Sequence, residues 1–114
     1  PAYEAAATRV IGTTPEAELL RAVARGEAPE GPAPDAPLAA AVHDAFANPT
    51  PPPELMALAR EQQLGMAILR LLSMLHDGAS GDTAALRDAL ATLRALGLED
   101  TARRAALQIV LLHQ

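Results

Sequence analysis

The chain contains no cysteine, no lysine and no tryptophan. The absence of cysteine excludes disulfides and thiol chemistry, although it leaves the compartment unknown. Nine arginines face fourteen acidic residues, and the resulting net charge of -5 argues against a nucleic-acid surface, which needs clustered cations. No apolar run reaches the roughly 20 residues that a membrane-spanning helix needs. We therefore expect no nucleic-acid partner and no membrane span in this segment.

Aromatic and β-branched residues are also scarce. Tyr3 and Phe46 are the only aromatic residues, whereas half of the chain is apolar and consists mostly of alanine and leucine. These two residue types favour helices, and the shortage of β-branched residues disfavours a sheet. A chain of 114 residues can bury one modest core. The composition therefore predicts a single all-α domain.

Proline and glycine divide the chain into three parts. The stretch "GEAPEGPAPDAP" is rich in proline, glycine and acids, and such a composition buries too little to fold. We predict an N-terminal helical arm over residues 1–26, a linker over 27–37 and a helical domain over 38–114. The linker is expected to be mobile and to be the first site of limited proteolysis, because it offers no buried anchors.

Capping signals place the helices within these parts. Thr14 precedes a proline and Asp82 precedes a helical pattern, as N-caps do, and Asp100 is predicted to cap the last helix. Gly97 lies where a left-handed residue ends a helix, with Leu98 able to fold back in a Schellman motif. The predicted helices are Ala2–Ile11, Pro15–Arg25, Leu38–Ala47, residues 54–61, Met66–His76, residues 83–96 and Thr101–Leu112.

The helix Met66–His76 is apolar on nearly all sides, with only Arg70 and Ser73 polar inside it. A helix of this kind is usually buried on more than one face. We predict that it is the central and most buried helix of the domain, and that Leu69 and Leu72 are core residues.

Residues 54–76 and 89–111 line up at an offset of 35 and predict two helix–turn–helix units. A period near 34 residues is typical of tetratricopeptide repeats, so the expected fold is a small bundle of α-hairpins with a TPR-like, α-solenoid-like architecture and a repeat core over 54–112. The aromatic signature of that repeat is missing. The matching pairs are Leu55 with Leu90, Leu58 with Leu93, Ala67 with Ala102, and Leu71, Leu72 and Leu75 with Ala106, Leu107 and Val110.

The last helix carries a second apolar stripe formed by Ala105, Ile109 and Leu112. In a solenoid this stripe faces the next repeat, but a capping repeat normally turns a polar face outward. The three residues are therefore interface candidates. They can be covered by the N-terminal helices, which is the interpretation we favour, by a second copy in a homodimer, or by a protein partner.

The run "LGMAILRLL", followed by an "HDG" turn and by "LRALGLEDTAR", resembles the helical C-terminal region of long alphaproteobacterial proteins. Such proteins often carry the automatic label antifreeze glycopeptide polyprotein. The resemblance covers roughly residues 54–112 and consists of alanine- and leucine-rich sequence. It implies a larger parent protein, exported to the cell envelope, and brings no reaction with it.

Two His-Asp doublets, His43-Asp44 and His76-Asp77, form the one candidate metal site. In an all-α chain they resemble the metal phosphohydrolases named for their HD motif, in which imidazoles and carboxylates hold divalent ions that activate water. No lysine follows the second doublet, and each residue has an ordinary alternative. His76 suits a helix C-terminus, and Asp77 with its following glycine is typical of a helix end.

The sequence therefore predicts a non-enzymatic helical-repeat scaffold or protein–protein interaction module, without a cofactor. It contains no nucleophile motif, Walker loop or dinucleotide fingerprint. The alternative is a degenerate metal-dependent phosphohydrolase of the HD type.

Overall fold

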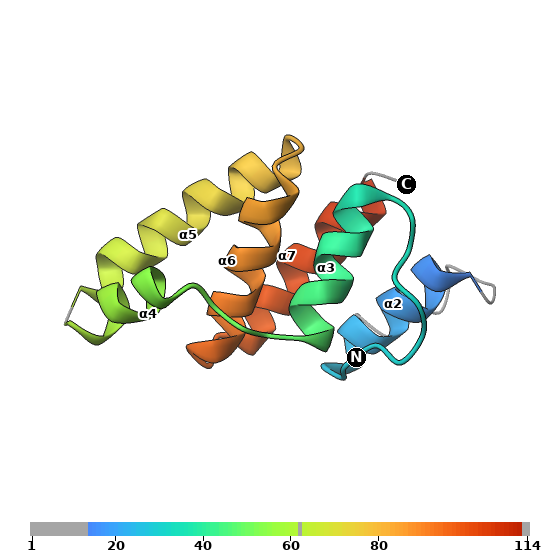
Figure 1. Ribbon diagram of the computed structural model, residues 1–114, viewed down its shortest axis with the longest axis horizontal. Helices are drawn as coiled ribbons and strands as arrows, with labels where there is room; N and C mark the ends of the chain where they lie inside the picture. Colours follow the sequence, from blue (N-terminus) through green and yellow to red (C-terminus); the bar gives the residue numbers. More distant parts are fainter. Residues whose placement is uncertain (1–13, 62, 113–114) are drawn as a thin grey trace.

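The computed structural model describes residues 14–61 and 63–112 (Figure 1). Within these residues the chain forms helices and no strand, so the predicted all-α fold is confirmed. The predicted helix Ala2–Ile11 lies outside the described residues. The helices are α2 (Pro15–Arg25), α3 (Pro37–Ala47), α4 (Pro53–Arg60), α5 (Leu64–Ala79), α6 (Thr83–Ala95) and α7 (Glu99–Leu112).

The helices are arranged in a row along the longest axis of a molecule that measures 44 × 27 × 21 Å. Helices α4 and α5 pack together at one end, and α6 packs against α5. On its other side α6 packs against α3 and α7, and α2 lies beyond α7 at the opposite end (Figure 1). Helix α6 is therefore the centre of the fold.

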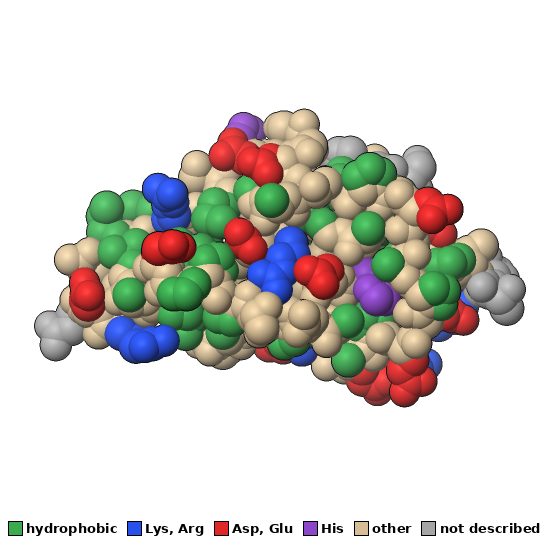
Figure 2. All heavy atoms as spheres, viewed as in Figure 1, with side chains coloured by type: hydrophobic (Ala, Val, Ile, Leu, Met, Phe, Trp, Pro, Cys, Tyr) green, Lys and Arg blue, Asp and Glu red, His purple; other side chains and the backbone are tan. Residues whose placement is uncertain are grey.

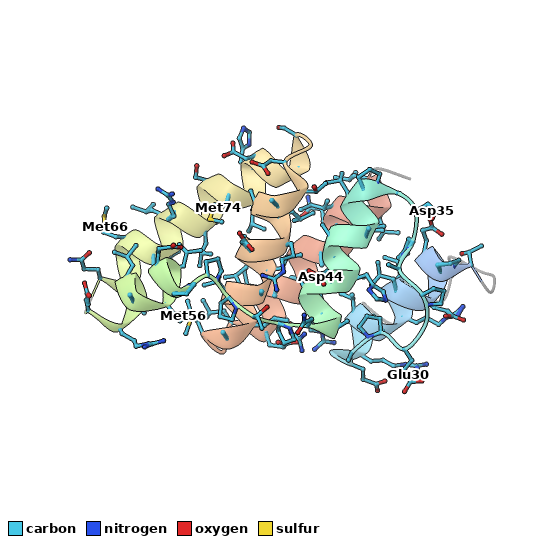
Figure 3. The ribbon with its side chains drawn as sticks, viewed as in Figure 1. Glu30, Asp35, Asp44, Met56, Met66 and Met74 are labelled. Carbon is cyan, nitrogen blue, oxygen red and sulfur yellow. The ribbon has the colours of Figure 1, made fainter. Side chains whose placement is uncertain are left out.

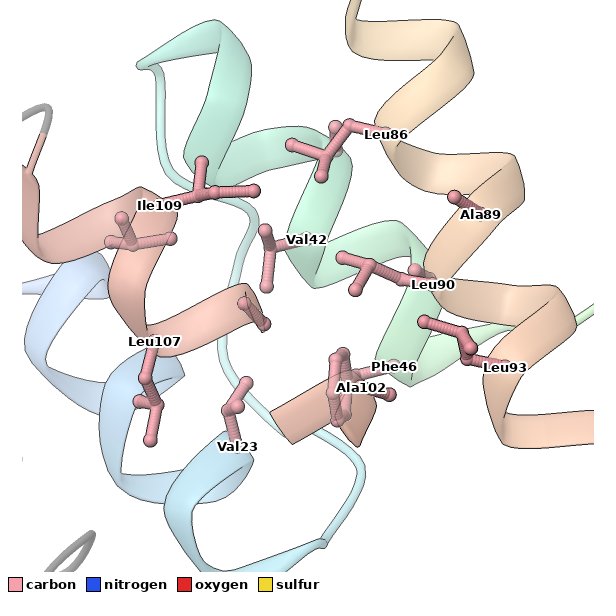
Figure 4. Close-up of a cluster of buried hydrophobic side chains, with 14 of the residues drawn as sticks. Val23, Val42, Phe46, Leu86, Ala89, Leu90, Leu93, Ala102, Leu107 and Ile109 are labelled. Carbon is pink, nitrogen blue, oxygen red and sulfur yellow. The ribbon is translucent and has the colours of Figure 1, made fainter. Parts of the chain in front are cut away.

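The side chains of the central helix and of its neighbour α3 are among the most buried. Leu86, Ala89 and Leu90 of α6 are fully buried, together with Val42 and Phe46 of α3 (Figure 4). Every helix from α2 to α7 contributes to the same core cluster.

The prediction that Met66–His76 is the most buried helix is wrong. Helix α5 lies at the end of the row, so only the side that faces α4 and α6 has neighbours. Its buried residues are Ala67, Leu71 and Gly78, whereas Leu69 and Leu72 are 63% and 55% exposed. The apolar sequence of α5 therefore does not reflect burial within this chain.

Helix α5 also continues past its predicted end at Asp77-Gly78 and stops only at Ala79. Gly78 is buried where α5 meets α6, and a Cβ atom at this position would lie 2.7 Å from Cβ of Leu86. The glycine therefore allows two helices to pack closely and does not end the helix. The connection between α5 and α6 consists of residues 80–82.

Three of the predicted caps are confirmed. The hydroxyl of Thr14 accepts from the amide of Ala17, and Oδ1 of Asp82 accepts from the amide of Ala85 at 3.0 Å. Gly97 has a φ of +82°, and the amide of Leu98 donates to the carbonyl of Leu93, as in a Schellman motif.

The predicted Asp100 cap is wrong. Helix α7 begins one residue earlier, at Glu99, so Asp100 lies within the first turn. There it accepts a hydrogen bond from Nη2 of Arg104 at 2.8 Å.

Three arginines of α6 and α7 bind the carbonyl groups at the ends of other helices. Arg87 donates to the carbonyls of Asn48 and Thr50 after α3, and Arg94 donates to the carbonyl of Phe46 while lying 4.5 Å from its ring centroid. Arg103 donates to the carbonyls of Val23 and Ala24 at the end of α2. These carbonyls lie at or just after the C-terminal ends of helices, so a half-buried arginine there donates to them and complements the helix dipole.

The N-terminal arm and the linker are tied to the rest of the chain. Leu19, Leu20 and Val23 of α2 belong to the core cluster. In the linker Pro34 is buried, and Nε2 of His43 lies 2.9 Å from the carbonyl oxygen of Gly31. The expectation that the linker has no buried anchor is thus wrong at these positions, while its early proteolysis stays a prediction.

Candidate functional site

The most exposed apolar surface of the described chain lies on α5. Four of its large apolar residues are between 49% and 63% exposed, and Met66 points away from the bundle at the end of the row (Figure 3). Monomeric proteins rarely leave such side chains grouped on one element without a function. We name this surface the outer α5 face; it consists of Leu64, Met66, Leu69 and Leu72.

The outer α5 face has few charges around it. From residue 62 to residue 76 the chain carries one formally charged side chain, Arg70, and the oppositely charged pair Arg60 and Glu61 comes directly before. Acidic side chains gather instead near α2, at the other end of the molecule, where Glu30 lies (Figures 2 and 3). Between residues 53 and 76 the two arginines, Arg60 and Arg70, are balanced by two glutamates, Glu54 and Glu61, although the whole chain is acidic.

Gly65 adds a second feature to the outer α5 face. It precedes Leu69 and Leu72 by four and seven residues, so the three residues share one side of α5. A Cβ atom at Gly65 would meet no atom within 4 Å, so packing inside the chain does not require a glycine here. The helix thus presents a notch beside two exposed leucines.

The predicted stripe on α7 is divided between the core and the surface. Ile109 belongs to the core cluster and Ala105 packs against that cluster, whereas Leu112 is 71% exposed at the helix end. Helix α2 packs along α7, on the side where Leu107 lies near Val23 (Figure 4).

The two His-Asp doublets lie on different helices and each residue has its own surroundings. His43 contacts the Gly31 carbonyl oxygen, and Asp44 accepts from Nε of Arg87 at 2.9 Å. His76 and Asp77 are exposed near the end of α5. Residues 14–61 and 63–112 contain no group of three or more His, Cys, Asp or Glu side chains that could hold a metal ion.

The larger surface cavities carry no set of catalytic groups that we recognise. A cavity of about 730 Å³ lies among the starts of α2, α3 and α6 and is lined mainly by small apolar residues, with Glu16 as its charged group. A second, of about 490 Å³, lies between α4, α5 and α6 and combines Leu55, Leu58 and Met74 with charged side chains, among them Arg70.

No helix within the described residues is long and apolar enough to cross a membrane. No protein-family model, curated protein or solved structure matches the chain. The chemistry of the surface is therefore what indicates how the chain can act.

The sequence did not reveal the outer α5 face as a surface, because it placed Leu69 and Leu72 in the core. One signal was present: Gly65 interrupts an apolar helix without ending it. Glycine in a helix costs roughly 0.5–1 kcal/mol relative to alanine and often has a packing or functional reason.

Proposed function

We propose that this chain is a non-enzymatic protein-interaction module, a helical scaffold that binds a protein partner through the outer α5 face. The observation that supports it is the exposure of Leu64, Met66, Leu69 and Leu72 on one helix at the end of the row. Leaving these side chains in water forgoes favourable burial, and a partner that covers them recovers it.

The proposal includes a repeat architecture. Helix α4 packs against α5, and α6 packs against α7, in the order expected of two consecutive hairpins. The matched residues Ala67 and Ala102 are both fully buried. Such hairpins are stacking units whose open end accepts a further element. The resemblance to envelope proteins of bacteria adds the proposal that the hairpins belong to a larger chain.

Site-specific photo-crosslinking in the native cells tests this function. A photoreactive amino acid at position 69 is expected to yield adducts with another protein, because this position lies in the centre of the face. The matched control is position 111, another exposed leucine, which lies outside both the outer α5 face and the predicted stripe on α7. Adducts specific to position 69 would support the module. Equal labelling from both positions, or no adduct from position 69, would contradict it.

A further inference from the structure

The sulfur atoms of the chain lie in different environments. Because cysteine is absent, the only sulfur atoms are those of Met56, Met66 and Met74. Met56 and Met74 are half-buried, and Met74 packs against the core cluster beside the cavity between α4, α5 and α6. Met66 is 60% exposed and points away from the bundle (Figure 3). One thioether is therefore much more open to solvent than the other two.

The residues around Met66 leave its side chain open to a small oxidant. Gly65 directly before it has no side chain, and a Cβ atom there would meet no atom within 4 Å. Leu69, three residues further along α5, lies on the same side of the helix and is itself 63% exposed. The other members of the outer α5 face are leucines, whose side chains are saturated hydrocarbons. The thioether of Met66 is thus the one readily oxidised group on this face.

The reaction that this position allows is the oxidation of a thioether to a sulfoxide. A lone pair of the Met66 sulfur attacks one oxygen of hydrogen peroxide, so that an S–O bond forms while the O–O bond breaks. The proton of the transferred oxygen leaves with the other oxygen as water. The sulfur loses two electrons and the peroxide gains them. Methionine sulfoxide reductases reverse the change.

The place of Met66 in α5 separates a change of the surface from a change of the fold. Helix α5 begins at Leu64, so Met66 lies in the first turn, where backbone amides lack partners within the helix in any case. Its side chain is not among the buried residues of α5. A polar oxygen on Met66 therefore remains in water, whereas the same oxygen on Met74 would lie against the core cluster.

We propose that Met66 is a redox-sensitive modification site, whose selective oxidation to the sulfoxide makes the outer α5 face more polar and weakens partner binding while the fold persists. The weakening of binding rests on the proposed function; the selective oxidation and the persistence of the fold do not. A partner that covers the face also covers Met66, so the modification acts on the unbound chain.

Peptide mapping after treatment of the full chain with dilute hydrogen peroxide tests the selectivity. Because the chain has no lysine, trypsin cleaves only after arginine and places the three methionines on separate peptides, residues 26–60, 61–70 and 71–87. In the folded chain Met66 should be oxidised at least about threefold faster than Met56 or Met74. In urea the three rates should become equal, because unfolding exposes all three thioethers. Equal rates in the folded chain, or a loss of helical circular dichroism as Met66 is oxidised, would overturn the proposal.

Two substitutions test the effect on binding. Met66→Gln introduces a polar side chain of similar length, as the sulfoxide does, and Met66→Leu is the matched apolar control, which hydrogen peroxide does not oxidise. The yield of adducts from the photoreactive amino acid at position 69 should fall at least about threefold with Met66→Gln, because the face becomes more polar. Met66→Leu should retain the yield.

Failure of this proposal and failure of the proposed function give different results. Adducts from position 69 that persist undiminished with Met66→Gln overturn the redox proposal and leave the interaction module standing. The absence of adducts from a chain with native Met66 contradicts the module, and with it the binding step. The peptide map decides in either case whether Met66 is oxidised selectively.

Discussion

At the scale of single residues, two glycines of one helix have opposite surroundings. A side chain at Gly78 would collide with Leu86, whereas a side chain at Gly65 would enter open space. Neither glycine has a positive φ, so both adopt backbone conformations that alanine tolerates. Any difference in the free energy of unfolding between substitutions at the two positions therefore reflects packing and not backbone strain.

We predict that Gly65→Ala raises the free energy of unfolding by roughly 0.5–1 kcal/mol, because alanine has the higher helix propensity. Gly78→Ala should lower it by roughly 1–3 kcal/mol, the usual cost of overpacking. Urea unfolding of the two variants measures both values. A gain in stability from Gly78→Ala would show that α5 and α6 are farther apart than described.

At the scale of elements, α6 is the central helix and α5 lies at the end of the row, which is the opposite of what their sequences suggest. Helix α6 contains charged residues such as Arg87 and Asp88, yet it has neighbours on two sides and includes the fully buried Leu90. Helix α5 is more apolar but has neighbours on one side only. The polar residues of α6 remain compatible with this position because Arg87 and Arg94 reach the carbonyl groups at the end of α3.

We predict that Leu90→Ala lowers the free energy of unfolding by roughly 2–5 kcal/mol, the range for an emptied leucine site in a core. Leu69→Ala should change it by less than about 0.5 kcal/mol, as is usual for exposed positions. Chemical denaturation of the two variants shows which of the two helices, α5 or α6, is the central one. Equal losses for the two variants would restore α5 as the central helix.

At the scale of the whole molecule, the two ends of the row are completed differently. At one end α2 covers α7, and Arg103 of α7 donates hydrogen bonds to two carbonyl groups at the end of α2. At the other end nothing in the described chain covers the outer α5 face. Stability at the first end therefore depends on the N-terminal arm, although proline-rich sequence separates the arm from the remaining helices.

We predict that a chain lacking residues 1–36 self-associates or precipitates, because the loss of α2 exposes Leu107 and leaves Arg103 without its carbonyl partners. Light scattering after size-exclusion chromatography measures the mass. A chain that begins at Thr14 retains α2 and is the reference. If both chains are monomeric and melt at the same temperature, α2 does not stabilise this end.

Local features of the fold could be predicted from the sequence because they depend on neighbouring residues. The Thr14 and Asp82 caps, the left-handed Gly97 and the bounds of α2 follow from side chains within a few positions of each other. Errors arose where a distant segment intervened. Gly78 lies within α5 and packs against Leu86 of the next helix, and Arg103 donates to the carbonyl of Val23, which is far away in the sequence.

The sequence by itself determined that this chain is helical and where most of its helices begin and end, because propensity and capping act over single turns. Only the tertiary structure decided which apolar helix faces are covered. Leu69 and Leu90 are the same residue type, yet Leu69 in the more apolar helix is exposed and Leu90 is buried. The physical reason is that burial depends on how many neighbours a helix has in the row, and α5 stands at its end whereas α6 stands at its centre.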